Sequence, residues 1–155
     1  MTKIPCYLID IDGTVADPTH RLHFIQPPEG IKKNWDAFFA ACVDDMPIEH
    51  MCELVRGLIR DRHVTGIIPL FISGRSDQYR HETRIWLDNQ HLMPIPLYMR
   101  RAGDFRPDYI IKAELLAVIK ADNFQPVMAF DDRAQVVKMW RENGIPCAQV
   151  AEGNF

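Results

Sequence analysis

The sequence predicts an α/β protein in which a mainly parallel, five-stranded sheet is doubly wound between two layers of helices. Two patterns support this fold class: short apolar runs alternate with segments of helical period, and three of the runs end in polar residues. Parallel strands joined by right-handed helical crossovers produce this alternation. With 155 residues and 47% hydrophobic content, the chain is expected to form a single domain over residues 1–155.

The first apolar run, residues 4–9, is predicted to be a buried strand. Residues 15–30 contain three prolines and are expected to be irregular. After Asn34, a candidate N-cap, apolar side chains recur at helical spacing, which predicts a short helix. We therefore expect a flap or helical insert over about 15–47, directly after the first strand.

The rest of the chain alternates between helix and strand. Pro47 is expected in the first turn of a helix whose apolar stripe runs from Met51 to Ile59. The run 95–99 has prolines beside and within it, which favours an edge strand. The other predicted elements are strands at 66–73, 127–130 and 145–150 and helices over 79–87, 108–119 and 136–140.

Composition excludes several classes of protein. A net charge of -3 argues against a protein that coats DNA in general, because that binding needs many cationic side chains. No apolar stretch reaches the ~20 residues of a membrane helix and no signal-peptide pattern is present, so we expect a soluble, cytoplasmic protein without a membrane partner. The four cysteines form no C-x-x-C pair and are expected to be reduced core thiols.

Two carboxylates, Asp10 and Asp12, follow the first strand in the motif D-x-D-G-T. Two acids this close at a buried strand end require a cation, or one of them must keep its proton. This suits a Mg²⁺ site in which a nucleophile and an acid/base lie side by side. By itself, the motif fits acids that only cap a turn about equally well.

Polar residues also follow two later strands. Ser73, Gly74 and Arg75 end one apolar run, and Asp131 and Asp132 end another. The carboxyl ends of parallel strands meet at one edge of a sheet, so we expect these groups to converge with the first two acids. A hydroxyl, backbone amides around the glycine and a guanidinium can hold phosphate oxygens while carboxylates hold Mg²⁺, which is the mixture that phosphoryl transfer needs.

Four features resemble the four motifs of the haloacid dehalogenase superfamily of phosphotransferases. They are D-x-D-G-T, the strand that ends at Ser73, a later lysine, and the pair Asp131-Asp132 at a strand end. Segments 71–75, 99–104 and 131–141, with Asp108 and Lys112, are more closely similar to the 3'-phosphatase domain of the polynucleotide kinase-phosphatase family. The resemblance extends from residue 4 to residue 155 and implies the haloacid dehalogenase-like fold, a three-layer sandwich.

The resemblance implies a Mg²⁺-dependent phosphomonoesterase that removes 3'-terminal phosphates from DNA or RNA ends in nucleic-acid end repair. Asp10 would be the nucleophile that forms an aspartyl-phosphate, and Asp12 the general acid that then activates water. Asp10, the backbone carbonyl of Asp12 and Asp131 would hold the metal, with Asp132 close behind. Opening of a 2',3'-cyclic phosphate is a further activity that the resemblance suggests.

The same resemblance assigns the phosphate-binding groups. Ser73 and Lys112 would neutralise phosphoryl oxygens. Arg21, Arg75 and Asp108 match further positions of the phosphatase site, Arg21 from the flap and Asp108 from the start of the helix that carries Lys112.

Two departures from the family limit what the resemblance implies. No glycine is followed by lysine, so the P-loop of a kinase domain is missing and kinase activity is not expected. The insert 17–47 differs from the family in sequence, which leaves substrate preference open. Alternatives are a mononucleotide phosphatase with the same chemistry and a non-catalytic phosphate-end binding module, whose signature would be loss of Asp10. A separate kinase or ligase stays open as a partner.

Other polar and aromatic residues have two interpretations each. His20 and His23 have the spacing of zinc ligands, but the nearby acids favour a hard, oxygen-bound ion. A basic loop at 100–106 either steers a nucleic-acid backbone or is an ordinary solvated loop. Three tryptophans lie on apolar helical stripes and are expected in the core rather than as base-stacking platforms; they are Trp35, Trp86 and Trp140.

Overall fold

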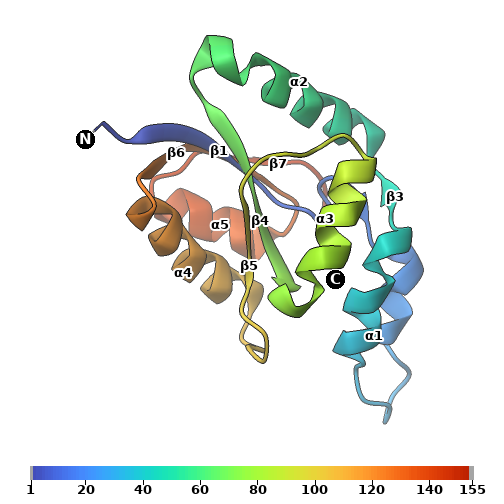
Figure 1. Ribbon diagram of the computed structural model, residues 1–155. Helices are drawn as coiled ribbons and strands as arrows, with labels where there is room; N and C mark the ends of the chain where they lie inside the picture. The colour runs from blue at the N-terminus through green and yellow to red at the C-terminus, as the bar shows by residue number, and fades with distance from the viewer. Residues whose placement is uncertain (1, 154–155) are drawn as a thin grey trace.

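Five parallel strands form the central sheet, in the order β5-β4-β1-β6-β7. The computed structural model describes residues 2–153 (Figure 1). The predicted fold class is confirmed, and the predicted edge strand does lie at an edge, as β5. The strands are β1 (Ile4–Ile9), β4 (Ile68–Ser76), β5 (Leu97–Arg100), β6 (Phe124–Asp131) and β7 (Cys147–Gln149).

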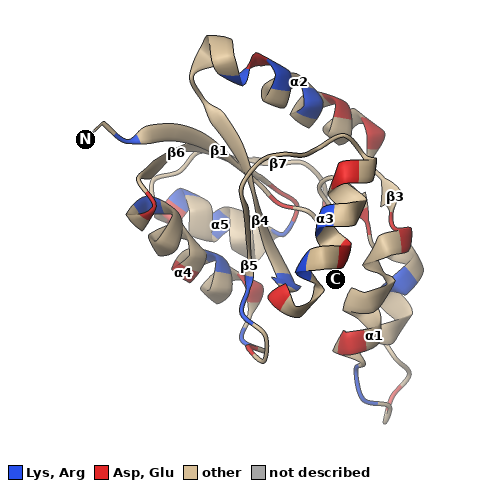
Figure 2. Cartoon of the chain, viewed as in Figure 1, with Lys and Arg blue, Asp and Glu red and all other residues tan. Residues whose placement is uncertain are grey.

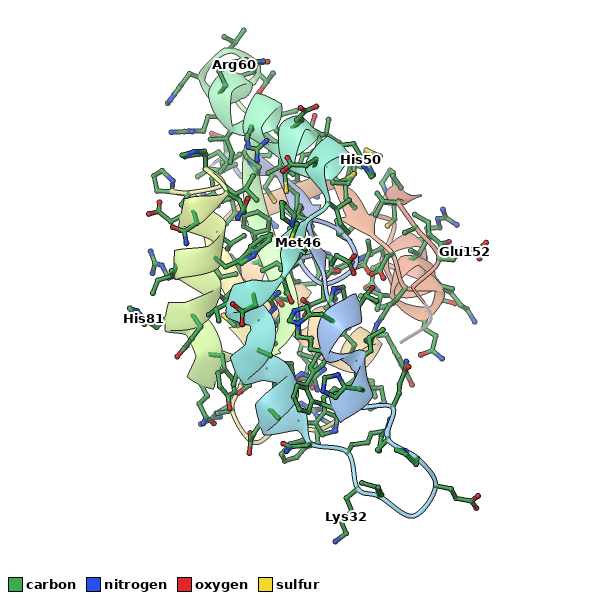
Figure 3. The ribbon with its side chains drawn as sticks, turned by 90° about the vertical axis from the view of Figure 1, so that its right-hand side faces the viewer. Lys32, Met46, His50, Arg60, His81 and Glu152 are labelled. Atoms are coloured by element: carbon green, nitrogen blue, oxygen red, sulfur yellow. The ribbon has the colours of Figure 1, made fainter. Side chains whose placement is uncertain are left out.

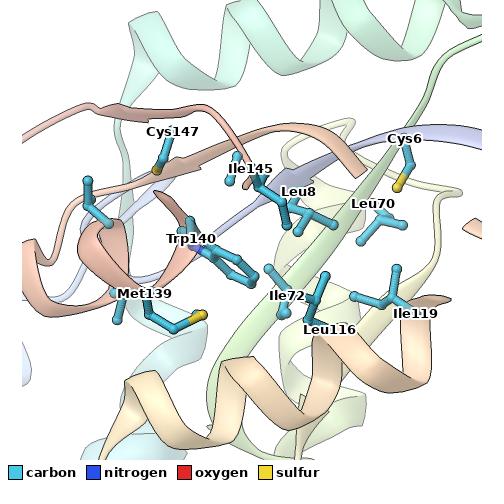
Figure 4. Packing of buried hydrophobic residues seen from close by; sticks show 13 residues of the cluster. Cys6, Leu8, Leu70, Ile72, Leu116, Ile119, Met139, Trp140, Ile145 and Cys147 are labelled. Atoms are coloured by element: carbon cyan, nitrogen blue, oxygen red, sulfur yellow. The ribbon is translucent and has the colours of Figure 1, made fainter. Parts of the chain in front are cut away.

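Helices cover both faces of this sheet. The helices α2 (Glu49–Thr65) and α3 (Arg80–Asn89) pack on one face, and α4 (Asp108–Ala121) and α5 (Ala134–Glu142) on the other. The alternation of side chains along a strand separates the two cores. Leu8 of β1 packs with residues of α4 and α5 (Figure 4), while the next residue, Ile9, packs with residues of α2 and α3.

The segment after β1 forms a separate small layer beside the sheet (Figure 1). Its ends are joined by an antiparallel pair of two-residue strands, β2 (Ala16–Asp17) and β3 (Met46–Pro47). Between them, two helical segments run side by side (Figure 3). The insert contains η1 (Thr19–Phe24), α1 (Trp35–Ala40) and η2 (Ala41–Asp44), and a further short turn, η3 (Asp77–Tyr79), precedes α3.

The start of α1 follows the sequence prediction, whereas the start of α2 does not. Asn34 caps α1 as predicted, because its side-chain oxygen accepts a hydrogen bond from the backbone N–H of Ala37. The expectation for Pro47 was wrong: it pairs in β3, and α2 begins two residues later, at Glu49. All four cysteines are buried and free, as expected.

Candidate functional site

The carboxyl ends of β1, β4 and β6 bring the predicted residues to one edge of the sheet. Asp10 directly follows β1, Ser73 lies near the end of β4 and Asp131 is the last residue of β6. β1 is hydrogen-bonded to both of the other strands, so the three ends are neighbours. The predicted convergence of these groups is therefore what the fold produces.

One half of the site surrounds Lys112, and we call it the lysine half. The buried ammonium lies 2.7 Å from Asp10 Oδ1, 2.8 Å from Asp131 Oδ2 and 3.3 Å from Asp108 Oδ2. Its side chain is 1% exposed, so it is not a surface lysine. The lysine half consists of Asp10, Asp108, Lys112, Asp131 and Asp132.

Asp132 is the member of this half that lacks hydrogen bonds. Neither of its buried carboxylate oxygens has a hydrogen-bond partner among residues 2–153. A Cβ added to Gly13 or to Gly153 would collide with this carboxylate, so both glycines allow the backbone to close around it. Burial, together with the neighbouring Asp131, raises the pKa of Asp132 to about 6.

Asp10 is held on both carboxylate oxygens. In addition to the lysine bond, Asp10 Oδ2 accepts a hydrogen bond of 3.2 Å from the Thr14 hydroxyl. Burial and the charges of Asp131 and Asp132 raise the pKa of Asp10 well above its ordinary value, even though Lys112 opposes the shift. A carboxylate at this position is therefore costly without additional positive charge.

The other half of the site surrounds two buried arginines, and we call it the arginine half. Arg75 Nε donates to both oxygens of Asp12 at 3.1 Å, and Arg21 bonds the same carboxylate. Burial opposes the ionised form of Asp12, but Arg75 and Arg21 outweigh it and hold the pKa of Asp12 below its usual range. The arginine half consists of Asp12, Arg21, Asp45 and Arg75.

Asp45 is a residue of the candidate site that sequence reasoning missed. Its Oδ2 accepts hydrogen bonds from Arg21 Nη2 at 2.6 Å and from Arg75 Nη2 at 2.8 Å, so it completes a network with Asp12. The indole of Trp86 donates to its backbone carbonyl at 2.8 Å. In the sequence Asp45 is only one of two acids before a proline, and no local pattern shows that the insert folds back over the site.

The β4 end supplies the predicted hydroxyl and glycine. Ser73 is 1% exposed, and its oxygen accepts a hydrogen bond of 3.1 Å from the backbone N–H of Arg75. At Gly74 a Cβ would collide with the Asp108 carboxylate, so the absence of a side chain brings β4 close to α4. The Gly74 carbonyl accepts a hydrogen bond of 2.6 Å from Arg100 Nε.

Three acids of the lysine half could hold a metal ion. Asp10, Asp131 and Asp132 each offer an oxygen, and these atoms all lie within 4.8 Å of one another. The two unpartnered oxygens of Asp132 and the raised pKa of Asp10 fit a hard cation that prefers carboxylate ligands. In the sequence-based prediction, Asp12 holds the metal through its backbone carbonyl and not through its side chain. This agrees with the structure, in which the Asp12 carboxylate accepts hydrogen bonds from the arginines.

The alternative zinc site finds no support in the structure. His20 Nε2 lies 2.9 Å from Asp45 Oδ1, and His23 Nδ1 lies 3.0 Å from the His20 carbonyl, so each ring contacts a group of the insert. Among residues 2–153, Asp10, Asp131 and Asp132 are the one group of three or more potential ligands close enough to share a metal ion. No helix of the described chain is long and apolar enough to cross a membrane.

Comparison with known proteins identifies the class to which this site belongs. The family model of the polynucleotide kinase PNKP phosphatase domain, a haloacid dehalogenase type, matches residues 4–155. The chain therefore belongs to this family and is a phosphomonoesterase. The resemblance seen in the sequence is confirmed.

Particular relatives are larger than this chain. A viral protein from Autographa californica nuclear polyhedrosis virus, named as a candidate bifunctional polynucleotide kinase/RNA ligase, is 29% identical over 140 residues, which is 90% of this chain and 18% of the relative. A chain in the structure of the Pnkp1/Rnl/Hen1 RNA repair complex is 27% identical with a TM-score of 0.80, over 99% of this chain and 44% of that one. The chain thus spans less than half the length of these relatives.

More distant structures share the fold alone. The class C acid phosphatase from Bacillus anthracis matches with a TM-score of 0.60 at 13% identity, over 98% of this chain and 70% of that one. This match shows that the two chains share an overall fold.

Proposed function

We propose that this chain removes the terminal 3'-phosphate from polynucleotide ends in a Mg²⁺-dependent reaction of nucleic-acid end repair. The observation that carries the proposal is the buried Asp10 beside Lys112 and Asp131, in a chain of the PNKP phosphatase family. The named relatives combine or assemble with kinase and ligase components, and one complex repairs RNA. RNA ends are therefore the first substrate to test, and a kinase or ligase is the partner class we propose.

In this proposal Asp10 is the nucleophile. A bond forms between its carboxylate oxygen and phosphorus while the bond from phosphorus to the 3'-oxygen breaks, which gives an aspartyl-phosphate. Water then attacks phosphorus and releases Asp10 and inorganic phosphate. Lys112, which already contacts Asp10, and Ser73 neutralise the phosphoryl oxygens during both steps.

Asp12 moves the protons. Its arginine partners favour the carboxylate, which is the form that accepts a proton from water in the second step. Donation of a proton to the 3'-oxygen in the first step requires these arginine bonds to weaken. The oxygens of an incoming phosphate are strong acceptors for guanidinium groups, so substrate binding to Arg21 and Arg75 would release Asp12 for this role.

The metal-binding groups of this proposal are Asp10, Asp131 and the backbone carbonyl of Asp12, with Asp132 next to them. When bound, Mg²⁺ supplies positive charge that stabilises the carboxylate of Asp10 and the phosphoryl oxygens. The two Asp132 oxygens, which have no hydrogen-bond partner among residues 2–153, would help to hold such an ion or orient its other ligands.

The test follows phosphate release from a 3'-phosphorylated RNA oligonucleotide, with and without EDTA. We expect chelation to stop release and Asp10→Asn to slow it by at least about 10³-fold, because the nucleophile is lost. Asp61→Asn is the matched control, since Asp61 lies exposed on α2. Release that persists in EDTA, or that Asp10→Asn leaves intact, would contradict the mechanism.

Substrate choice is tested with a panel of phosphate esters. Rates on the RNA oligomer, the corresponding DNA oligomer, a 3'-mononucleotide and a 5'-mononucleotide separate an end-repair enzyme from a nucleotidase. We expect the oligomers to be preferred. A preference for the 5'-mononucleotide would make the chain a nucleotidase with the same chemistry.

A further inference from the structure

The pocket that contains Asp10 and Asp12 continues into a chamber with aromatic walls. The cavity has a volume of about 460 Å³, which is the size of a small-molecule site. Beyond the two acids, four aromatic side chains line it: Trp35, Phe38, Phe39 and Phe105. They come from α1 and from the loop between β5 and α4, which lie at the same end of the molecule as the carboxyl ends of the strands (Figure 1).

Phe105 lies at this cavity with 79% of its surface exposed, which is unusual for a large aromatic side chain. Its backbone is held from both sides by one guanidinium. Arg100 Nη1 donates to the carbonyl of Asp104 at 3.1 Å and to the carbonyl of Arg106 at 2.6 Å, the two residues that flank Phe105. These two hydrogen bonds hold the loop backbone on both sides of Phe105.

Trp35, on the other wall, is held through its ring, and Lys33 Nζ lies 5.6 Å from the ring centroid. Its ring stacks on Phe39 with centroids 5.9 Å apart and meets Phe38 edge-on at the same distance. The guanidinium of Arg21 lies 4.1 Å from the centroid of the Phe38 ring. The aromatic wall is thus continuous with the arginine half, and unlike Trp86 and Trp140 the indole of Trp35 is only partly buried.

The charges around the cavity do not favour a second phosphate. Arg106 binds Asp104 and Glu114, each at 2.6 Å. Arg100 binds the loop carbonyls and the Asp108 carboxylate. Positively and negatively charged residues both lie along the loop between β5 and α4 (Figure 2). The charged lining residues are five acids (Asp10, Asp12, Asp36, Asp104 and Asp108) and three arginines (Arg100, Arg106 and Arg133). A flat, uncharged group suits such walls better than further backbone phosphates.

We propose that Phe105 and Trp35 form a binding subsite for the nucleobase of the terminal nucleotide, whose 3'-phosphate lies at Asp10. This inference rests on the proposed function and adds how the end is recognised: by stacking of one base. Every base has a π-face, so stacking accepts any terminal sequence. It also makes recognition depend on the last nucleotide more than on the length of the strand.

The experiment compares two 3'-phosphorylated RNA oligonucleotides that differ at the last nucleotide, one with a normal base and one abasic. For the wild-type chain we expect kcat/KM to be about 5- to 150-fold lower on the abasic end, as the loss of one stacked base predicts. Phe105→Ala should lower kcat/KM on the normal end toward the abasic value and change the abasic substrate little. Phe105→Trp should retain the preference for the base, and Trp35→Leu should reduce it.

Val64→Ala is the matched control, because Val64 is 89% exposed near the end of α2, a helix that contributes no residue to the cavity lining, and should change neither rate. Equal wild-type rates on the two ends, or equal losses on both ends in Phe105→Ala, would overturn the subsite while leaving the proposed function intact. Absence of phosphate release from either oligonucleotide by the wild-type chain would instead overturn the proposed function and the subsite with it.

Discussion

The two halves of the site begin two residues apart, at Asp10 and Asp12, yet they differ in electrostatic balance. The arginine half pairs two carboxylates with two guanidiniums. The lysine half has four carboxylates around one ammonium, with Arg100 at 3.3 Å from Asp108 as a further cation, and two oxygens of Asp132 lack hydrogen bonds. The charges of the arginine half are paired in the folded chain, whereas the lysine half has too little positive charge to balance its carboxylates.

Because of this difference in charge, the arginine half suits the positioning of side chains, and the lysine half suits the binding of a ligand. A satisfied network holds its side chains in one geometry, which suits a group such as Asp12 that must be aimed at a leaving oxygen. The lysine half has an excess of negative charge and therefore attracts a cation. The fold therefore places the positioning groups where they are stable without a ligand and the metal-binding groups where a ligand would relieve repulsion.

The largest expected effect comes from breaking the arginine half. Arg75→Ala leaves Asp12 and Asp45 buried with Arg21 as their remaining guanidinium partner. Removal of one partner from a buried ionic network costs about 3–5 kcal/mol of unfolding free energy. Urea denaturation measures this loss, with Arg60→Ala as the control, because Arg60 pairs with Asp61 on the exposed face of α2. A loss no larger than that of Arg60→Ala would show that the network does not stabilise the fold.

A somewhat smaller effect is expected in the lysine half without metal. The folded chain keeps the proton of Asp132 up to about pH 6, whereas the unfolded chain loses it near 3.8. The folded state therefore binds more protons between these values, and stability should fall as pH rises from 4 to 6, by up to about 3 kcal/mol. Asp10 shifts in the same direction.

The measurement is urea denaturation in EDTA across this pH range, with the wild-type chain and Asp132→Asn side by side. The variant should show a flatter profile. Stability that rises over the same range, or identical slopes in both chains, would contradict the raised pKa of Asp132.

The smallest of the three effects is expected when Mg²⁺ supplies the positive charge that the lysine half lacks. Mg²⁺ that binds only the folded chain should raise the unfolding free energy by about 2.7 kcal/mol at 100 times its dissociation constant. Asp131→Asn should lose this gain, while Asp12→Asn should keep it, because that substitution retains the backbone carbonyl. Thermal unfolding with and without Mg²⁺ measures both. An equal gain in the two variants would place the ion outside the lysine half.

The regular elements were largely readable from the sequence because they depend on local patterns. The cap at Asn34 and the apolar run 4–9 need only neighbouring residues to be recognised. Pro47 was placed in the wrong element because its partner in the β2–β3 pair, Ala16, lies far away in the sequence. The tryptophans show the same limit: Trp86 and Trp140 are buried as expected, but only packing shows that Trp35 lines a cavity.

By itself, the sequence determined which residues stand at the ends of the apolar runs, and parallel strand order is enough to bring Asp10, Ser73 and Asp131 together. Only the tertiary structure decided that Asp10 and Asp12 serve different halves of the site, and that Asp45 closes one of them. The physical reason is that strand periodicity is a local property, whereas the neutralisation of a buried charge depends on side chains from segments that meet only after the insert has folded over the sheet.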